Sequence, residues 1–87
     1  MNIEKIKILL TQKLNLQKIY ITGDENHIKI IAIGNIFKDL SPVKKQQIIY
    51  SPLMNMIVEK HIHAISIESY TLEEWNKKNI ISNNINN

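Results

Sequence analysis

The stretch HIKIIAIG, residues 27–34, is rich in β-branched residues and carries few polar ones. Such residues favour strands, and a strand this apolar is expected to be central in a sheet or covered on both faces. The preceding run at residues 18–23 has a similar composition, and GDEN, residues 23–26, is typical of a turn. Residues 18–34 therefore predict a β-hairpin.

Apolar residues recur at helical spacing ahead of the hairpin. They are Ile3, Ile6, Leu9, Leu10 and Leu14. This spacing predicts an amphipathic helix over residues 3–14. The first ten residues mix acidic and basic side chains with apolar ones and lack a small-residue cleavage site, so they favour a helix over a signal peptide. No apolar run reaches the roughly 18–20 residues that span a bilayer, and we expect a soluble, cytoplasmic protein.

A long helix is expected after the hairpin. Ser41-Pro42 combines a hydroxyl cap with proline at the first helical position, which is typical of a helix start. Apolar residues then continue at helical spacing, at Tyr50, Leu53, Met54, Ile57 and Val58. Pro52 falls inside this pattern and has no backbone N–H to donate. We therefore expect the segment to be kinked, or split into two helices just before Pro52.

The end of the chain predicts a third strand and a last helix. HAISIES, residues 63–69, alternates as a strand does, and TLEE from Thr71 has the pattern of a capping box that starts a helix near residue 72. Residues 77–87 are polar and low in complexity, so we expect a disordered tail there.

These segments give the order helix, strand, strand, helix, helix, strand, helix, written αββααβα. The order predicts an α+β fold with a three-stranded mixed sheet and helices packed on one face. A chain of 87 residues is expected to form a single small domain, which we place at residues 1–76, with the tail at 77–87 outside it. The absence of cysteine excludes disulfides, zinc ribbons and thiol nucleophiles. The net charge of +3 permits nucleic-acid binding but does not require it.

The connection between the second and third strands brings two histidines to one end of the sheet. A crossover of about 28 residues makes neighbouring strands parallel, and parallel strands start at the same end. His27 opens the second strand and His63 opens the third. Their backbones would lie about 5 Å apart if the strands are adjacent, or about 10 Å with one strand between them. Either gap suits two imidazoles on one metal, although a histidine at a strand edge is more often an ordinary polar residue. His61 is expected at a helix end with its ring in solvent.

At these spacings the sequence resembles the BolA family, most closely its YrbA (IbaG) branch. The elements that carry the resemblance are a strand-opening histidine in NHIKI, then FKDLSPVKKQQIIY, then IHAISI and finally YTLEEW. The similarity covers residues from about 4 to 75. It implies an αββααβα fold similar to class II KH domains, in agreement with the order above.

The resemblance also implies a non-enzymatic partner of monothiol glutaredoxins, monomeric alone and heterodimeric with its partner. In such heterodimers a [2Fe–2S] cluster is held by thiolates from the glutaredoxin and from glutathione, and the BolA-like chain supplies a histidine of the IHAISI motif, here His63. A second ligand comes from the loop between the first two strands, where His27 is the candidate. Many relatives carry Arg-His where this chain has Lys45-Gln46, and lysine cannot reproduce the bidentate contacts of arginine.

The alternative is a KH-like nucleic-acid-binding transcriptional regulator of a stress response. The KH signature is a G-x-x-G loop, which Gly23 and Gly34, the chain's only glycines, cannot form. Candidate phosphate contacts remain at Lys38, Lys44 and Lys45, for which solvated lysines are the simpler interpretation. An enzyme is disfavoured because the sequence offers no nucleophile–base pair and no phosphate-binding loop.

Overall fold

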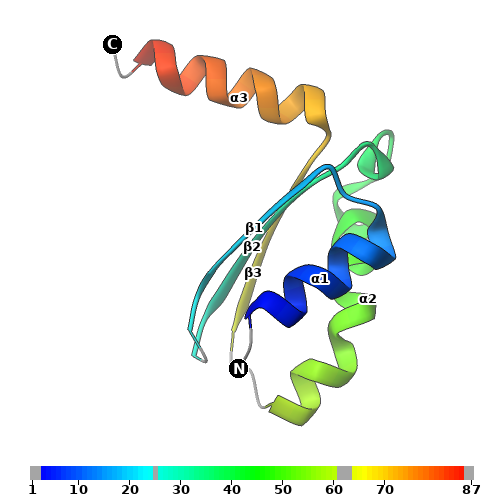
Figure 1. The fold of residues 1–87 in the computed structure, drawn as a ribbon. Coiled ribbons are helices and arrows are strands. Elements are labelled where there is room, and N and C mark those ends of the chain that lie inside the picture. Colours follow the sequence, from blue (N-terminus) through cyan, green and yellow to red (C-terminus); the bar gives the residue numbers. More distant parts are fainter. Residues whose placement is uncertain (1–2, 25, 61–63, 86–87) are drawn as a thin grey trace.

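The computed structural model describes residues 3–24, 26–60 and 64–85 and forms a mixed sheet with three α-helices and one short 3-10 helix (Figure 1). The elements in chain order are α1 (Ile3–Leu14), β1 (Lys18–Gly23), β2 (Ile28–Ile33), the 3-10 helix η1 (Asn35–Phe37), α2 (Pro42–Lys60), β3 (Ile65–Tyr70) and α3 (Leu72–Ile85). The expected α+β fold is confirmed.

The apolar strand β2 lies in the centre of the sheet, whose order is β1-β2-β3. β1 pairs with it antiparallel, with Lys18 opposite Ile33, and β3 pairs with it parallel, with Ile28 opposite Ile65. The crossover through α2 makes the two strands parallel, as predicted, and the strand order shows that they are adjacent, which the sequence left open. Consequently β2 and β3 begin at the same end of the sheet.

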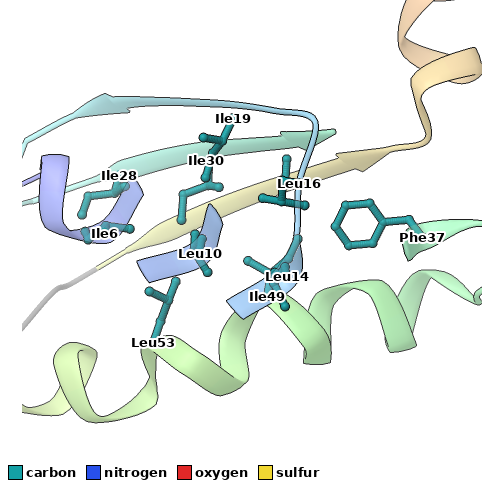
Figure 2. Packing of buried hydrophobic residues seen from close by; sticks show 11 residues of the cluster. Ile6, Leu10, Leu14, Leu16, Ile19, Ile28, Ile30, Phe37, Ile49 and Leu53 are labelled. Carbon is teal, nitrogen blue, oxygen red and sulfur yellow. The ribbon is translucent and has the colours of Figure 1, made fainter. Parts of the chain in front are cut away.

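The core lies between the sheet and the helices α1 and α2, which cover one of its faces (Figure 1). Isoleucines of the strands meet leucines of α1, and Ile49 and Leu53 of α2 close the layer from below (Figure 2). Phe37 of η1 is fully buried at one end of this layer. The fully buried side chains are Ile6, Leu10, Ile28, Ile30, Ile33, Phe37, Ile49 and Leu53.

Two helices start as the sequence predicts. The Ser41 Oγ accepts the backbone N–H of Lys44 at 3.2 Å, which caps the first turn of α2. Thr71 and Glu74 form the expected capping box. The Thr71 Oγ1 accepts the Glu74 N–H at 3.1 Å, and the Glu74 Oε1 accepts the Thr71 N–H at 2.8 Å.

Three expectations need correction. α2 runs without a break through Pro52, so the split into two helices is wrong. The short helical element that precedes α2 is η1, which the sequence analysis did not foresee. α3 does not join α1 and α2 on their face of the sheet, because it leaves from the end of β3 and projects away from the layer (Figure 1). Its span to Ile85 crosses the expected domain boundary at residue 76, while the disorder of 77–87 stays a prediction.

Candidate metal centre

Three hydrogen bonds to Asp24 order the turn between β1 and β2, and two of them hold the backbone of His27. The Asp24 Oδ1 accepts the backbone N–H groups of Asn26 at 2.9 Å and of His27 at 3.2 Å. The Asp24 N–H donates to the His27 carbonyl at 3.0 Å. Gly23 completes the turn at φ +111°, and a Cβ there would lie 2.1 Å from the His27 carbonyl oxygen. The turn sequence therefore fixes where His27 enters the sheet.

The imidazole of His27 lies on the exposed face of the sheet. Ile28 and Ile30 point into the core, so strand alternation places His27 on the opposite face, which we call the outer face. The ring is exposed, and its Nε2 lies 2.8 Å from the Ser66 Oγ on β3. The direction of this hydrogen bond depends on the tautomer.

The start of β3 lies directly beside His27. The Ile28 N–H donates to the Ala64 carbonyl at 3.0 Å, and the parallel register continues from there. Ala64 follows His63 in the sequence. His63 itself and His61 lie outside the described residues, so the ligand role of the first and the solvent-exposed ring of the second stay predictions.

One exposed imidazole, held by its neighbours, suits a metal ligand in this place. Metal-bound histidines usually use one ring nitrogen for the metal and the other for a hydrogen bond that orients the ring. If the Nδ1 of His27 binds metal, the Nε2–H donates to Ser66 and fixes both tautomer and ring. Among the residues that the structure describes, no three His, Cys, Asp or Glu side chains gather into a metal-binding group.

Ser66 belongs to a polar row on β3 that the sequence analysis missed. Glu68, the next residue on the same face, forms an ion pair with Lys29 of β2 at 3.0 Å and accepts the hydroxyl of Tyr70 at 2.5 Å. The Tyr70 hydroxyl, followed by Lys29, holds the pKa of Glu68 below its usual value. The same hydrogen bond raises the pKa of Tyr70 to about 12. Period-two alternation in ISIESY carries the signal for this row.

An aromatic cluster stands at the far end of this row. Trp75, in the first turn of α3, packs against Tyr70 with ring centroids 5.4 Å apart and against Tyr20 of β1 at 5.8 Å. The Lys78 Nζ lies 5.6 Å from the centroid of the Tyr70 ring. These contacts attach α3 to the outer face of the sheet.

The three lysines considered for nucleic acid have different surroundings. Lys38 shares a hollow with Glu73 of α3, whereas Lys44 borders a different hollow beside Lys13. Lys45 acts on Glu74, whose pKa is lowered first by the Thr71 backbone N–H and further by the charge of this lysine. Acidic residues near two of the three lysines weaken their attraction for phosphate.

No helix within the described ranges is both long enough and apolar enough to cross a membrane.

Known proteins resemble this chain over most of its length. Residues 3–74 match the family model of BolA-like proteins. An uncharacterized protein of Buchnera aphidicola subsp. Acyrthosiphon pisum is 69% identical over 77 residues, which covers 88% of this chain and 96% of the relative. The acid stress protein IbaG of Escherichia coli K12 is 45% identical over 71 residues, covering 82% of this chain and 84% of IbaG.

Solved structures with the same fold include a bol-like protein from Babesia bovis, with a TM-score of 0.76 at 19% identity, covering 91% of this chain and 94% of that one. BolA1 and the BolA domain of SufE1, both from Arabidopsis thaliana, each give a TM-score of 0.73 and cover 82% of this chain and 92% of theirs, at 23% and 22% identity. At these identities the likeness concerns the fold alone.

Proposed function

The chain belongs to the BolA-like family, and from this premise we propose that it is a partner of a monothiol glutaredoxin, with which it co-ligates a [2Fe–2S] cluster for iron–sulfur trafficking or sensing. It acts as a binding module and not as an enzyme, and it works in the cytoplasm. The acid-stress name of its Escherichia coli relative supports a link between this role and stress.

One observation carries the proposal. The parallel pairing of β2 with β3 bonds Ile28, the residue after His27, to Ala64, the residue that follows His63 in the IHAISI motif. This pairing supports a shared centre for the two histidines at the same end of the sheet. The cluster's remaining ligands would be thiolates from glutaredoxin and glutathione, since this chain has no cysteine.

The two histidines have different parts in the proposal. His63 is the ligand carried by the family motif. His27 is the second ligand, and Ser66 orients its ring through the 2.8 Å contact at Nε2. Histidine ligation of one iron raises the potential of a [2Fe–2S] cluster above that of an all-thiolate one and makes ligation sensitive to protons. The protein contributes an exposed imidazole on a rigid strand end, which a partner can reach.

Anaerobic co-expression with a monothiol glutaredoxin from the same organism tests this proposal. Visible absorption and circular dichroism of the purified complex are compared for the wild type, His63→Ala and His27→Ala. We expect a spectrum distinct from that of the glutaredoxin homodimer, lost or altered in both variants. His61→Ala is the matched control, because it removes a neighbouring histidine that the proposal does not use.

Other outcomes are equally informative. If His63→Ala alone changes the spectrum, His27 is not the second ligand. If the wild type forms no mixed complex, or if both variants keep the wild-type spectrum, the proposal is wrong. Ser66→Ala should keep the cluster but alter its circular dichroism, because the His27 ring loses the contact that orients it.

A further inference from the structure

β1 forms a free edge of the sheet as far as the structure describes the chain. The Asp24 N–H bonds to the His27 carbonyl, so these residues face each other as a hydrogen-bonded pair of the antiparallel ladder. Hydrogen-bonded and non-hydrogen-bonded pairs alternate along an antiparallel ladder. Ile21 lies opposite Ile30, three positions from the bonded pair, and these two residues are therefore a non-hydrogen-bonded pair. The backbone N–H and C=O groups of Ile19 and Ile21 consequently point away from β2, toward the outside of the sheet.

A hollow of about 380 Å³ runs along this edge, between β1 and α1. It is lined by Lys7, Thr11, Leu16, Gln17, Lys18, Ile19 and Tyr20. Tyr20 is 45% exposed and offers an aromatic surface on the outer face. The edge thus presents main-chain hydrogen-bonding groups beside a space that an added strand can enter.

The charges at this edge determine which kind of strand can pair with β1. Among the described residues, the charged side chains that line the hollow are Lys7 and Lys18, both exposed cations, and none that lines it is acidic. A second copy of the chain would add the same exposed lysines to this edge and no acidic partner for them from its own β1. Exposed lysines on an edge strand oppose pairing with neutral or basic strands and favour an acidic one.

We propose that the free edge of β1 binds an acidic segment of another protein in extended conformation, as a fourth strand of the sheet. Main-chain hydrogen bonds to Ile19 and Ile21 supply the pairing. Because side chains alternate along a strand, acidic residues on one face of the segment meet Lys7 and those on the other face meet Lys18. Tyr20 shares its face of β1 with Lys18, so an apolar residue two positions along the segment from the acid that meets Lys18 packs on Tyr20.

This surface is separate from the proposed metal centre. Lys18 pairs with Ile33 at the end of β2, whereas His27 precedes its start. Six residue steps along β2, from His27 to Ile33, place Lys18 and His27 about 20 Å apart. The inference therefore goes beyond the proposed function, and the isolated chain suffices to test it without glutaredoxin or cluster.

The test uses a fluorescein-labelled octapeptide made of two Glu-Glu-Val-Val repeats, which places both glutamate and valine on each face of an extended strand. Anisotropy measures its binding at low salt, and amide hydrogen exchange followed by NMR locates it. We expect new protection at the amides of Ile19 and Ile21 and little change at Tyr20, whose amide already faces β2. Lys18→Glu should weaken binding roughly fivefold, as loss of an exposed ion pair does, and Lys13→Glu on α1, outside the hollow, should leave it unchanged.

Two control ligands make the result decisive. The same peptide with alternate backbone nitrogens methylated keeps its charges but cannot pair as a strand, and a single-stranded DNA oligonucleotide offers phosphates without a peptide backbone. The proposal is overturned if the methylated peptide binds as well as the original, or if DNA binds while the peptide protects no amide. It also fails if Lys18→Glu leaves peptide binding unchanged and only promotes self-association, since the lysine would then serve to prevent edge pairing.

Discussion

Single residues on the outer face of β3 connect the two ends of the sheet. Ser66 contacts His27, Glu68 contacts Lys29, and Tyr70 contacts Trp75 at the base of α3. Alternation in the sequence could have placed these side chains on one face, but the identity of their partners depends on the register between β2 and β3. Register is a tertiary property, because a shift of one residue would exchange the faces.

The hydroxyl of Tyr70 provides a pH-dependent test of this row. Its pKa is raised from 10.0 to about 12, chiefly because the hydroxyl donates to Glu68. The folded chain holds this proton more tightly than the unfolded chain does. The stability that the interaction contributes is therefore fully present below pH 10 and is lost as the pH rises through about 12.

We expect the tyrosinate absorbance of the folded protein to include a step near pH 12 that Tyr70→Phe removes. Tyr20→Phe is the matched control, since Tyr20 belongs to the same aromatic cluster but does not contact Glu68. A step that survives in Tyr70→Phe and disappears in Tyr20→Phe would contradict the assignment. Glu68→Gln should move the Tyr70 step to lower pH, because the charged acceptor is gone.

At the scale of elements, sequence patterns predicted the helix starts correctly, because residues close together in the chain determine them. The caps at Ser41 and Thr71 depend on short-range hydrogen bonds that the sequence states directly. Pro52 was harder to interpret, because its local cost opposes the burial of Ile49 and Leu53 on either side of it. Packing of these residues against the sheet keeps α2 in one piece. Helix rules based on neighbouring residues do not include the free energy of this packing.

The capping box of α3 gives the prediction at this scale. Thr71→Ala removes the acceptor of the Glu74 N–H and should cost the helix about 1 kcal/mol. Because α3 contacts the rest of the described chain mainly through β3 and the aromatic cluster, we expect the loss to be local. Helical circular dichroism should fall and Trp75 fluorescence should change, with little effect on the main unfolding transition.

Ser41→Ala is the control for this experiment, because Ser41 caps a helix that forms part of the core. Ser41→Ala should lower the stability by a similar free energy, but this decrease should appear in the main unfolding transition. If Thr71→Ala lowers the main transition as much as Ser41→Ala does, α3 is more strongly coupled to the core than its contacts indicate.

At the scale of the whole molecule, the central strand sets the arrangement. An apolar β2 needs neighbours on both edges, the short turn provides β1 antiparallel, and the crossover returns β3 parallel. Length and composition were enough to predict the hairpin and the parallel crossover, and hence that β2 and β3 start at the same end of the sheet. They left open whether β3 is adjacent to β2, which the strand order decides. The sequence could not predict that α3 leaves the layer, because its few contacts come from one aromatic cluster and not from a continuous apolar stripe.

The last prediction concerns which part of the chain holds the fold. Among the side chains that the structure describes, the core and the residues packed against it extend no further than Ile67, and Trp75 makes the aromatic contacts of α3. A chain ended after Asn76 keeps all of these. It loses the Lys78 contact with Tyr70, worth about 0.5–1 kcal/mol at an exposed site, and the exposed ion pair of Lys77 with Glu73, which contributes little. Its free energy of unfolding in urea should therefore stay within about 1 kcal/mol of that of the full chain.

Leu10→Ala in the full chain, which opens a cavity at a fully buried position, should cost about 2–5 kcal/mol. If the shortened chain loses as much as Leu10→Ala, residues 77–87 are part of the folded domain and the boundary at 76 is wrong.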